Sequence, residues 1–299
     1  MICFLSALAG AAALAGESPD QSQSLRSRMR EDLLRMNDFF DTTLPGTLEE
    51  YNIILKFSPK FSDLRDNEFI RYPLELRYGL TPRWELFGGM TPYHPNPFNE
   101  GRDHAWGFGE ARLGARYDLR KFLGVFDQAT VGFESRLPLG TPPEEIIGRY
   151  THLRPFLLTS RKLAFVPDTT FFVNFAYDRE VDTPTRDQPS MSQTHIGEVG
   201  PGFLYKPGEF GAFASYRYRH ITRDIGSHNA HDNKVGVLWD VPLTRTQRLK
   251  LPGKWQLELA YKYNVEEGYE TDQGVTARVS WRTTLREVLK APEKSVQKK

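Results

Sequence analysis

Alternation of apolar and polar residues runs along most of the chain. In the stretch from Trp255 to Val265, WQLELAYKYNV, every odd position is apolar or aromatic and nearly every even position is polar or charged. A period of two indicates a β-strand with two different faces, because successive side chains of a strand point to opposite sides. Similar stretches recur about twelve times between residues 51 and 281, an even number typical of bacterial barrels. The sequence therefore predicts an all-β protein.

The links between these strands differ in length between the two ends of the predicted sheet. At one end they are predicted at GLTPR near Gly79, and at 120–127, 161–168, 206–209 and 243–254. The links at the other end are mostly longer and are predicted at 91–105, 140–151, 179–194 and 221–232. Longer loops at one end are typical of outer-membrane barrels.

Two folds could accommodate the apolar face of these strands. A soluble sandwich would bury that face between two sheets. A closed barrel of about twelve strands could not fill its interior with aliphatic side chains, because about eight strands already give a filled interior. The predicted strand length of about nine to eleven residues is the length that crosses a membrane. We therefore expect a transmembrane antiparallel up-and-down β-barrel of about twelve strands, preceded by a short N-terminal periplasmic helix.

The tryptophans favour the membrane fold. Aromatic side chains gather at both interfaces of a membrane barrel. In the predicted topology, one girdle at the periplasmic interface consists of Trp84, Trp239, Trp255 and Trp281.

The polar face of such a barrel would line its lumen, and it carries charges of both signs on most strands. The residues expected to line the lumen are Glu75, Arg77, Glu85, Glu110, Arg112, Arg116, Glu134, Arg136, Arg217, Arg219, Glu258, Lys262 and Arg278. These charges could pair across a narrow lumen and close it, or form opposed ladders that orient a polar solute. The sequence leaves both arrangements open.

The segments outside the barrel are predicted as follows. Residues 1–16 resemble an export signal, because an apolar run ends in small residues, although a buried N-terminal helix is the alternative. Residues 17–48 form a periplasmic segment, in which apolar positions at helical spacing from Leu25 to Phe40 predict a helix that docks at the barrel mouth or plugs the lumen. Residues 49–283 form the barrel and residues 284–299 a periplasmic tail.

Composition excludes several classes of function. The net charge is only +1, which argues against a nucleic-acid partner held by a basic face. The one cysteine, Cys3, lies within the predicted export signal, so the mature chain would have no disulfide and no thiolate metal ligand. We expect no cofactor and no metal.

One cluster could be catalytic. Ser227, His228, His231 and Asp232 lie close together in the sequence, and an Asp–His pair can activate a hydroxyl group. The two histidines with Asp224 could also bind a metal. A polar surface loop is the preferred interpretation of this stretch, and also of the one that holds His94, Asp103 and His104. Gly197, Gly200 and Gly202 precede no helix, so they are interpreted as a glycine-rich strand.

Three phrases carry a resemblance to a known family. YPLELRYGLTPRWELFGGMTPY, GFGEARLGARYDL and RLPLGTP resemble the hairpins of a broad outer-membrane family of transporters, named after a protein of the meta-pathway of phenol degradation. The final strand, ending VTARVSW, is similar to a barrel-assembly signal, although residues 282–299 follow it. The resemblance implies an outer-membrane location, a partnership with the barrel-assembly machinery and the uptake of hydrophobic small molecules.

Three functions follow from these observations. The preferred hypothesis is a passive channel or transporter for small molecules, not an enzyme, with outer-membrane lipid around it and a charged lumen. The alternatives are an outer-membrane lipid hydrolase acting through Ser227 and His228, and a non-conducting structural or binding barrel.

Overall fold

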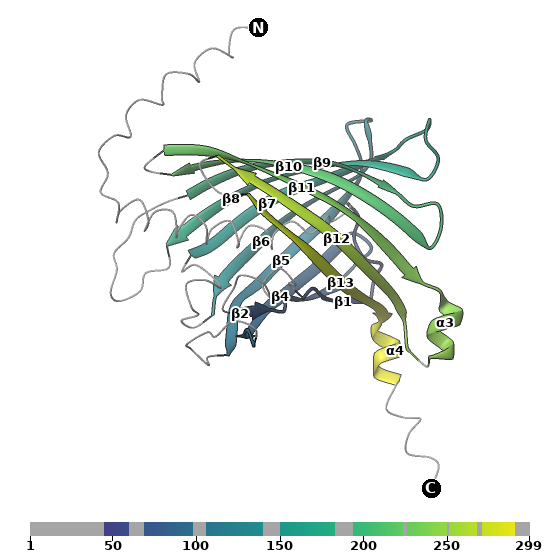
Figure 1. Ribbon diagram of the computed structural model, residues 1–299. Coiled ribbons are helices and arrows are strands. Elements are labelled where there is room, and N and C mark those ends of the chain that lie inside the picture. Colours follow the sequence, from purple (N-terminus) through teal and green to yellow (C-terminus); the bar gives the residue numbers. More distant parts are fainter. Residues whose placement is uncertain are drawn as a thin grey trace.

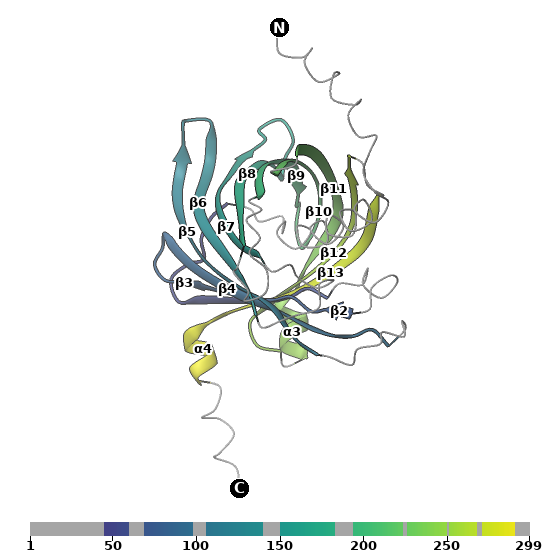
Figure 2. The same cartoon turned by 90° about the vertical axis from the view of Figure 1, so that its left-hand side faces the viewer.

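The protein is a closed β-barrel in which every strand is antiparallel to its neighbours (Figure 1). The computed structural model describes residues 45–59, 69–97, 106–139, 150–182, 194–223, 226–249, 251–267 and 271–290. The predicted export signal and the predicted helix between Leu25 and Phe40 lie outside the described residues. Figure 2, turned by 90°, shows the strands arranged in a ring.

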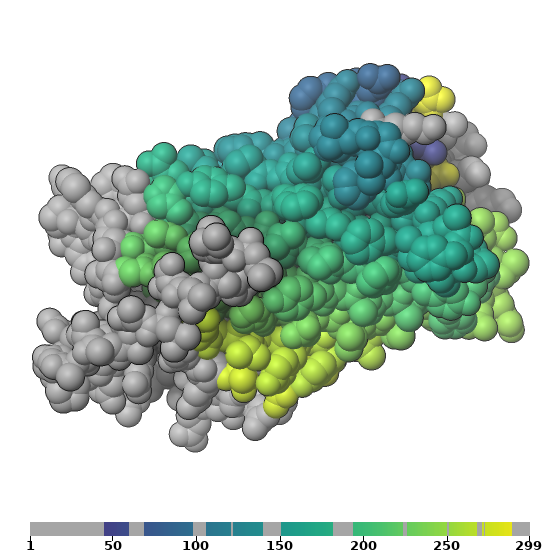
Figure 3. All heavy atoms as spheres, turned by 90° about the horizontal axis from the view of Figure 1, so that it is seen from above, coloured from purple at the N-terminus to yellow at the C-terminus, as the bar shows by residue number. Residues whose placement is uncertain are grey.

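The strands follow one another around the wall in the order of the sequence. Their bounds are β1 Asn52–Phe57, β2 Phe69–Arg71, β3 Leu74–Gly79, β4 Trp84–Pro95, β5 Gly107–Phe122, β6 Phe126–Pro138, β7 Tyr150–Lys162, β8 Thr169–Asp182, β9 Thr194–Tyr205, β10 Phe210–Arg223, β11 Gly226–Val241, β12 Lys254–Glu266 and β13 Asp272–Thr284. The barrel closes where β1 pairs with β13, with Asn52 opposite Thr284. Figure 3 shows part of this wall from outside, as adjoining bands of colour.

The strands β2 and β3 together form one strand of the wall. Both pair with β4, and Tyr72 and Pro73 separate them. Proline has no N–H for the ladder, so it interrupts a strand. Counting β2 and β3 together, the structure is a 12-strand barrel. The predicted all-β fold and strand number are therefore confirmed.

Two predictions about strand and loop bounds are wrong. The strands from β4 to β13 run for 12 to 16 residues, longer than the predicted length, and so extend beyond the predicted ends. Residues 221–232 were expected to form a loop, but β10 continues to Arg223 and β11 starts at Gly226. These residues belong to strands because the antiparallel pairing of β10 with β11 continues through them, with Ile221 opposite His228 and Arg217 opposite Asp232. Likewise, β8 continues to Asp182, into the predicted loop at 179–194.

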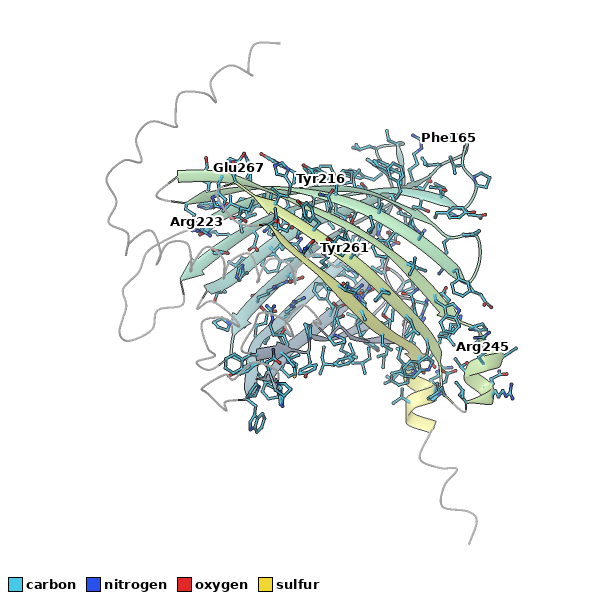
Figure 4. All side chains as sticks on the ribbon, viewed as in Figure 1. Phe165, Tyr216, Arg223, Arg245, Tyr261 and Glu267 are labelled. Carbon is cyan, nitrogen blue, oxygen red and sulfur yellow. The ribbon has the colours of Figure 1, made fainter. Side chains whose placement is uncertain are left out.

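The barrel has two distinct ends. We call the end where β1 begins the turn end and the opposite one the loop end. Two short helices lie at the turn end, α3 Leu243–Arg248 and α4 Leu285–Lys290, and the sequence pattern had predicted neither (Figure 1). Figure 4 shows Phe165 and Arg245 at the turn end and Arg223 and Glu267 at the loop end. No helix within the described residues is long and apolar enough to cross a membrane.

The apolar face of the strands points outward. On β12 the side chains of Leu257, Leu259 and Tyr261 are exposed, whereas Ala260 and Asn264 on the other face are buried. Exposed large apolar residues recur in the same phase on β3 to β6 and on β8 to β13. So large an exposed apolar surface is unfavourable in water, and it forms the lipid-facing band of a membrane barrel.

The inside of the wall contains aromatic rings packed on glycines. A Cβ atom added to Gly132 on β6 would lie 2.2 Å from Cζ of Phe156, which is the residue directly opposite on β7. In the same way, the ring of Phe87 packs on Gly114 and the ring of Phe172 packs on Gly202, each glycine being the residue opposite the ring on the next strand. Glycine is required at these positions because the ring occupies the space of a side chain.

We expect Gly132→Ala to destabilise the barrel by about 1–3 kcal/mol, because the added methyl group displaces a packed ring. Urea unfolding of the protein in lipid vesicles, followed by tryptophan fluorescence, measures this change. The matched control is Gly197→Ala on β9, where the added Cβ atom has no neighbour within 4 Å. Equal stability of the two variants would show that the packing of the Phe156 ring does not require a glycine at position 132.

Candidate functional site in the barrel interior

The thirteen predicted lumen residues all lie on the face opposite the exposed apolar side chains. Eight are buried, namely Arg77, Glu85, Glu110, Arg116, Glu134, Arg136, Arg217 and Arg219. The other five, partly accessible to solvent, are Glu75, Arg112, Glu258, Lys262 and Arg278. Alternation of side chains along each strand produces this placement, and ion pairs between neighbouring strands then bring the charges together.

Glu85 is the centre of the ion cluster nearest the turn end. Its carboxylate accepts hydrogen bonds from Nε of Arg77 at 2.5 Å and from Nη2 of Arg116 at 2.8 Å, and its side chain is 0% exposed. Glu75 lies beside this group and pairs with Lys56 at 3.0 Å. Strands β3, β4 and β5 supply the three residues of the central group, because the register places Glu85 directly opposite Arg116.

The chain just before β1 lies inside the barrel at the turn end. The backbone N–H of Leu48 donates to Oε2 of Glu85 at 2.8 Å, and that of Gly46 donates to Oγ1 of Thr130 at 2.7 Å. Glu85 is on β4 and Thr130 is on β6, and both are fully buried. Residues 45–48 therefore cross part of the interior, from the start of β1 toward β6.

A second ion cluster lies on β5 and β6. Glu110 accepts a hydrogen bond from Nε of Arg112 at 2.9 Å and lies 3.6 Å from Nη1 of Arg136. Glu134 accepts one from Nε of Arg136 at 2.9 Å. The cluster therefore contains equal numbers of positive and negative charges, two of each.

A third set of charges lies on β10 to β13. Asp232 pairs with Nε of Arg217 at 2.5 Å and with Nε of Arg219 at 3.1 Å. Glu258 pairs with Nζ of Lys234 and with Nη1 of Arg278, each at 2.8 Å.

Sequence reasoning missed the charges on β7 to β9. Nδ1 of His152 lies 3.2 Å from Asp178 and 3.8 Å from Glu180, while Nη2 of Arg154 pairs with Glu198 at 3.0 Å. The phase of β7 is hard to assign because apolar residues occupy both of its faces, as in Phe156 to Leu158. The alternation of His152 and Arg154, two residues apart, is the signal that could have revealed the inward face.

The candidate catalytic cluster is not assembled as the hydrolase hypothesis requires. Ser227 and His228 are consecutive residues of β11, so their side chains point to opposite faces of the strand. Nε2 of His228 lies 2.7 Å from Glu266, and Nδ1 of His231 lies 2.6 Å from the hydroxyl oxygen of Tyr216. His94 is exposed on β4, and Asp103, His104 and Asp224 lie outside the described residues. Within the described residues, no group of three or more side chains could hold a metal ion.

The outer surface carries aromatic residues near both ends. The four predicted tryptophans lie near the turn end, where Trp255 and Trp281 are neighbours with ring centroids 6.1 Å apart. Near the loop end the aromatic partners are histidines, since Tyr216 stacks on His231 and Tyr177 on His195. From Trp255 to Tyr263 is about 26 Å along β12, which at a strand tilt of about 40° covers about 20 Å of an apolar band about 25 Å tall.

The side chain of Glu267 lies beyond this apolar band, at the loop end. The side chain of Asn229 donates a hydrogen bond to Glu267 at 3.1 Å, and this bond holds the pKa of the Glu267 carboxyl below its usual value. This carboxylate therefore stays ionised at neutral pH.

Comparisons with known proteins support the fold. Known protein families give no match, and no curated protein matches the chain. An outer membrane channel from Pseudomonas putida F1 aligns with a TM-score of 0.52 and 10% identity, over 82% of this chain and 99% of that one. The fold is that of an outer-membrane β-barrel. The NanC porin aligns with a TM-score of 0.49 and 12% identity, over 78% of this chain and 98% of its own.

The identity of 10% with the Pseudomonas putida channel supports a shared fold and no more. The KdgM porin aligns with a TM-score of 0.41 and 11% identity, over 78% of this chain and 98% of its own. The resemblance to the phenol-degradation family therefore stays a prediction.

Proposed function

We propose that the protein is a passive channel for small polar solutes in the outer membrane of a Gram-negative-type bacterium. The observation that carries this proposal is the combination of an exposed apolar outer face with an interior lined by acidic and basic side chains that pair with one another. The outer face would contact lipid, and the interior would contact water and solute. The likeness to an outer membrane channel supports the proposal.

The lumen charges would then determine which solutes pass. Glu75, Arg112, Glu258, Lys262 and Arg278 are partly accessible to solvent, so a solute in the lumen would meet them first. The buried charges would hold the wall together and set the field behind them. The four tryptophans would lie at the periplasmic interface, and the barrel-assembly machinery would insert the chain.

Gel mobility and conductance test this proposal. The purified protein should migrate differently in SDS with and without boiling, show strand-dominated circular dichroism in detergent, and form channels in a planar bilayer. A protein that stays soluble without detergent and migrates identically in both gels would exclude the membrane fold.

We expect replacement of both Arg112 and Arg116 by Gln to shift the ion preference of the channel toward cations. The change removes two positive charges from the interior, and the remaining carboxylates then attract cations. Reversal potentials in a salt gradient measure the preference. Arg245→Gln, on exposed helix α3 at the turn end, is the control and should leave the preference unchanged. An unchanged preference in the double variant would contradict a lumen role for these arginines.

A non-conducting barrel is the second candidate function. The burial of the interior charges favours it, because Glu85 and Arg219 are inaccessible to solvent and residues 45–48 occupy part of the turn end. A barrel that folds in micelles but shows no conductance would support this alternative over the channel.

A further inference from the structure

The link between β11 and β12 is folded and carries no acidic residue. It contains helix α3, and backbone hydrogen bonding continues past the helix, where N of Leu251 donates to the carbonyl oxygen of Thr246 at 2.8 Å. From Leu243 to Lys254 the sequence has two arginines and two lysines, and neither aspartate nor glutamate. The link is therefore a positively charged element at the turn end (Figure 1).

One side of α3 is apolar and is left uncovered by the rest of the described structure. Thr246 is buried, and Leu243 and Leu249 lie on either side of it, because residues three apart share one side of a helix. Leu243 is nevertheless 53% exposed and Leu249 66% exposed, and Leu251 just after the helix is exposed too. Leucines gathered at a surface in this way are unfavourable in water. This side of the link therefore requires an apolar partner.

The link is held beside the aromatic girdle of the turn end. The guanidinium carbon of Arg245 lies 5.5 Å from the centre of the Trp239 ring. Nε1 of Trp255 and Nε1 of Trp281 both donate to the carbonyl oxygen of Pro252, at 2.9 and 2.7 Å. Tryptophans of this kind mark the edge of the apolar band of a membrane barrel. The exposed leucines of the link therefore continue the lipid-facing surface at its edge.

Two other links at the turn end also expose apolar side chains but differ in charge. Leu123 between β5 and β6 and Phe165 between β7 and β8 are both exposed. Each has an aspartate a few residues further on, Asp127 in the first case and Asp168 in the second. A carboxylate repels the phosphate group of a lipid. Positive charge without a carboxylate thus distinguishes the link of α3 from these two.

We propose that the link from Leu243 to Lys254 is a docking site for anionic phospholipid in the membrane leaflet at the turn end. Its leucines enter the boundary of the acyl chains and its basic side chains contact the phosphate groups, as in helices that lie at a membrane interface. Continuity with the lipid-facing band favours a lipid as the occupant, and the four basic residues favour an anionic headgroup. The inference rests on the membrane barrel and is independent of its conductance.

Quenching of tryptophan fluorescence by brominated phosphatidylglycerol tests the headgroup preference. In vesicles that mix this lipid with unbrominated phosphatidylcholine, the wild-type barrel should bind phosphatidylglycerol more tightly. R248Q/K254Q should lower the ratio of the two binding constants by at least about fivefold, the effect of one basic residue near an anionic surface. Arg248 and Lys254 are exposed, and so are Arg161 and Lys162 at the turn end of β7. R161Q/K162Q removes the same charge there and should retain the wild-type ratio.

Two results of this experiment would overturn the inference. One is a wild-type ratio of one. The other is an equal loss in R248Q/K254Q and R161Q/K162Q, because general attraction between the turn end and the membrane would then explain the preference. Gel mobility checks that each variant is folded, and R248Q alone replaces the double variant if that one fails to fold.

A nitroxide label tests the contact of the leucines with lipid. On L249C, in a chain whose one native cysteine, Cys3, is replaced by alanine, the label should be reached by oxygen and shielded from a water-soluble nickel complex. T244C is the matched control, because Thr244 is exposed on the opposite side of α3, where the nickel complex should reach the label. Equal access of the nickel complex to both labels would overturn the inference. Shielding of position 249 from both reagents would also overturn it, in favour of a second copy of the chain on this surface. Absence of conductance would contradict the channel function alone.

Discussion

Replacing Glu85 with alanine is expected to lower the free energy of unfolding by about 3–5 kcal/mol, the usual cost of removing one partner from a buried ion pair. The carboxylate binds Arg77 and Arg116 and accepts the backbone N–H of Leu48. Its loss leaves two cations near one another, and among the described residues no other carboxylate pairs with both of them. It also releases the N-terminal segment from β4. Urea unfolding in lipid vesicles measures the change.

The control for this variant is Glu49→Ala. The side chain of Glu49 is 84% exposed and lies 3.7 Å from Arg282, so its removal should change stability by less than about 0.5 kcal/mol. If the two variants were equally stable, the cluster around Glu85 would not contribute to folding. Equal conductance of the Glu85 variant and the wild type would show separately that residues 45–48 do not narrow the lumen.

Replacing Leu259 with arginine is expected to destabilise the barrel by about 2–4 kcal/mol, the cost of a charge on the lipid face at the middle of the membrane. Leu259 is 51% exposed and lies midway between Trp255 and Tyr263 on β12. Its surroundings in the membrane are hydrocarbon, which cannot solvate a guanidinium group. Reversible unfolding in vesicles again gives the difference.

Leu123→Arg is the control because it introduces the same charge outside the band. Leu123 is 77% exposed in the turn between β5 and β6, and the cost near an interface is about 0–1 kcal/mol. A Leu259 variant as stable as the Leu123 variant would mean that the odd face of β12 does not contact lipid.

The sequence predicted the strands best where alternation is clean. On β12, Leu257 and Leu259 alternate with Glu258, and the structure exposes the leucines and pairs the glutamate inside. Prediction was poorest on β7 and at the loop end of β10 and β11. There, apolar residues on both faces of β7 and short polar residues around Ser227 obscure the period of two, although the ladder continues through both places.

The two short helices were missed for a different reason. Both α3 and α4 have six residues, which is too short for a helical period to stand out from its surroundings. Thr283 and Thr284 precede α4, and hydrogen bonds from Thr283 and Thr284 to Glu287 hold its first turn. These local contacts depend on where β13 ends.

By itself, the sequence determined the class of fold and, on the strands where alternation is clean, the face that turns outward and the charges that lie on the other face. Alternation fixes these properties because side chains of a strand point to opposite sides whatever its neighbours are. Only the tertiary structure decided which charges meet. The register places Arg116 opposite Glu85 and Lys262 opposite Lys234, and ring closure brings β13 to β1. These pairings join residues distant in sequence, so no local pattern contains them.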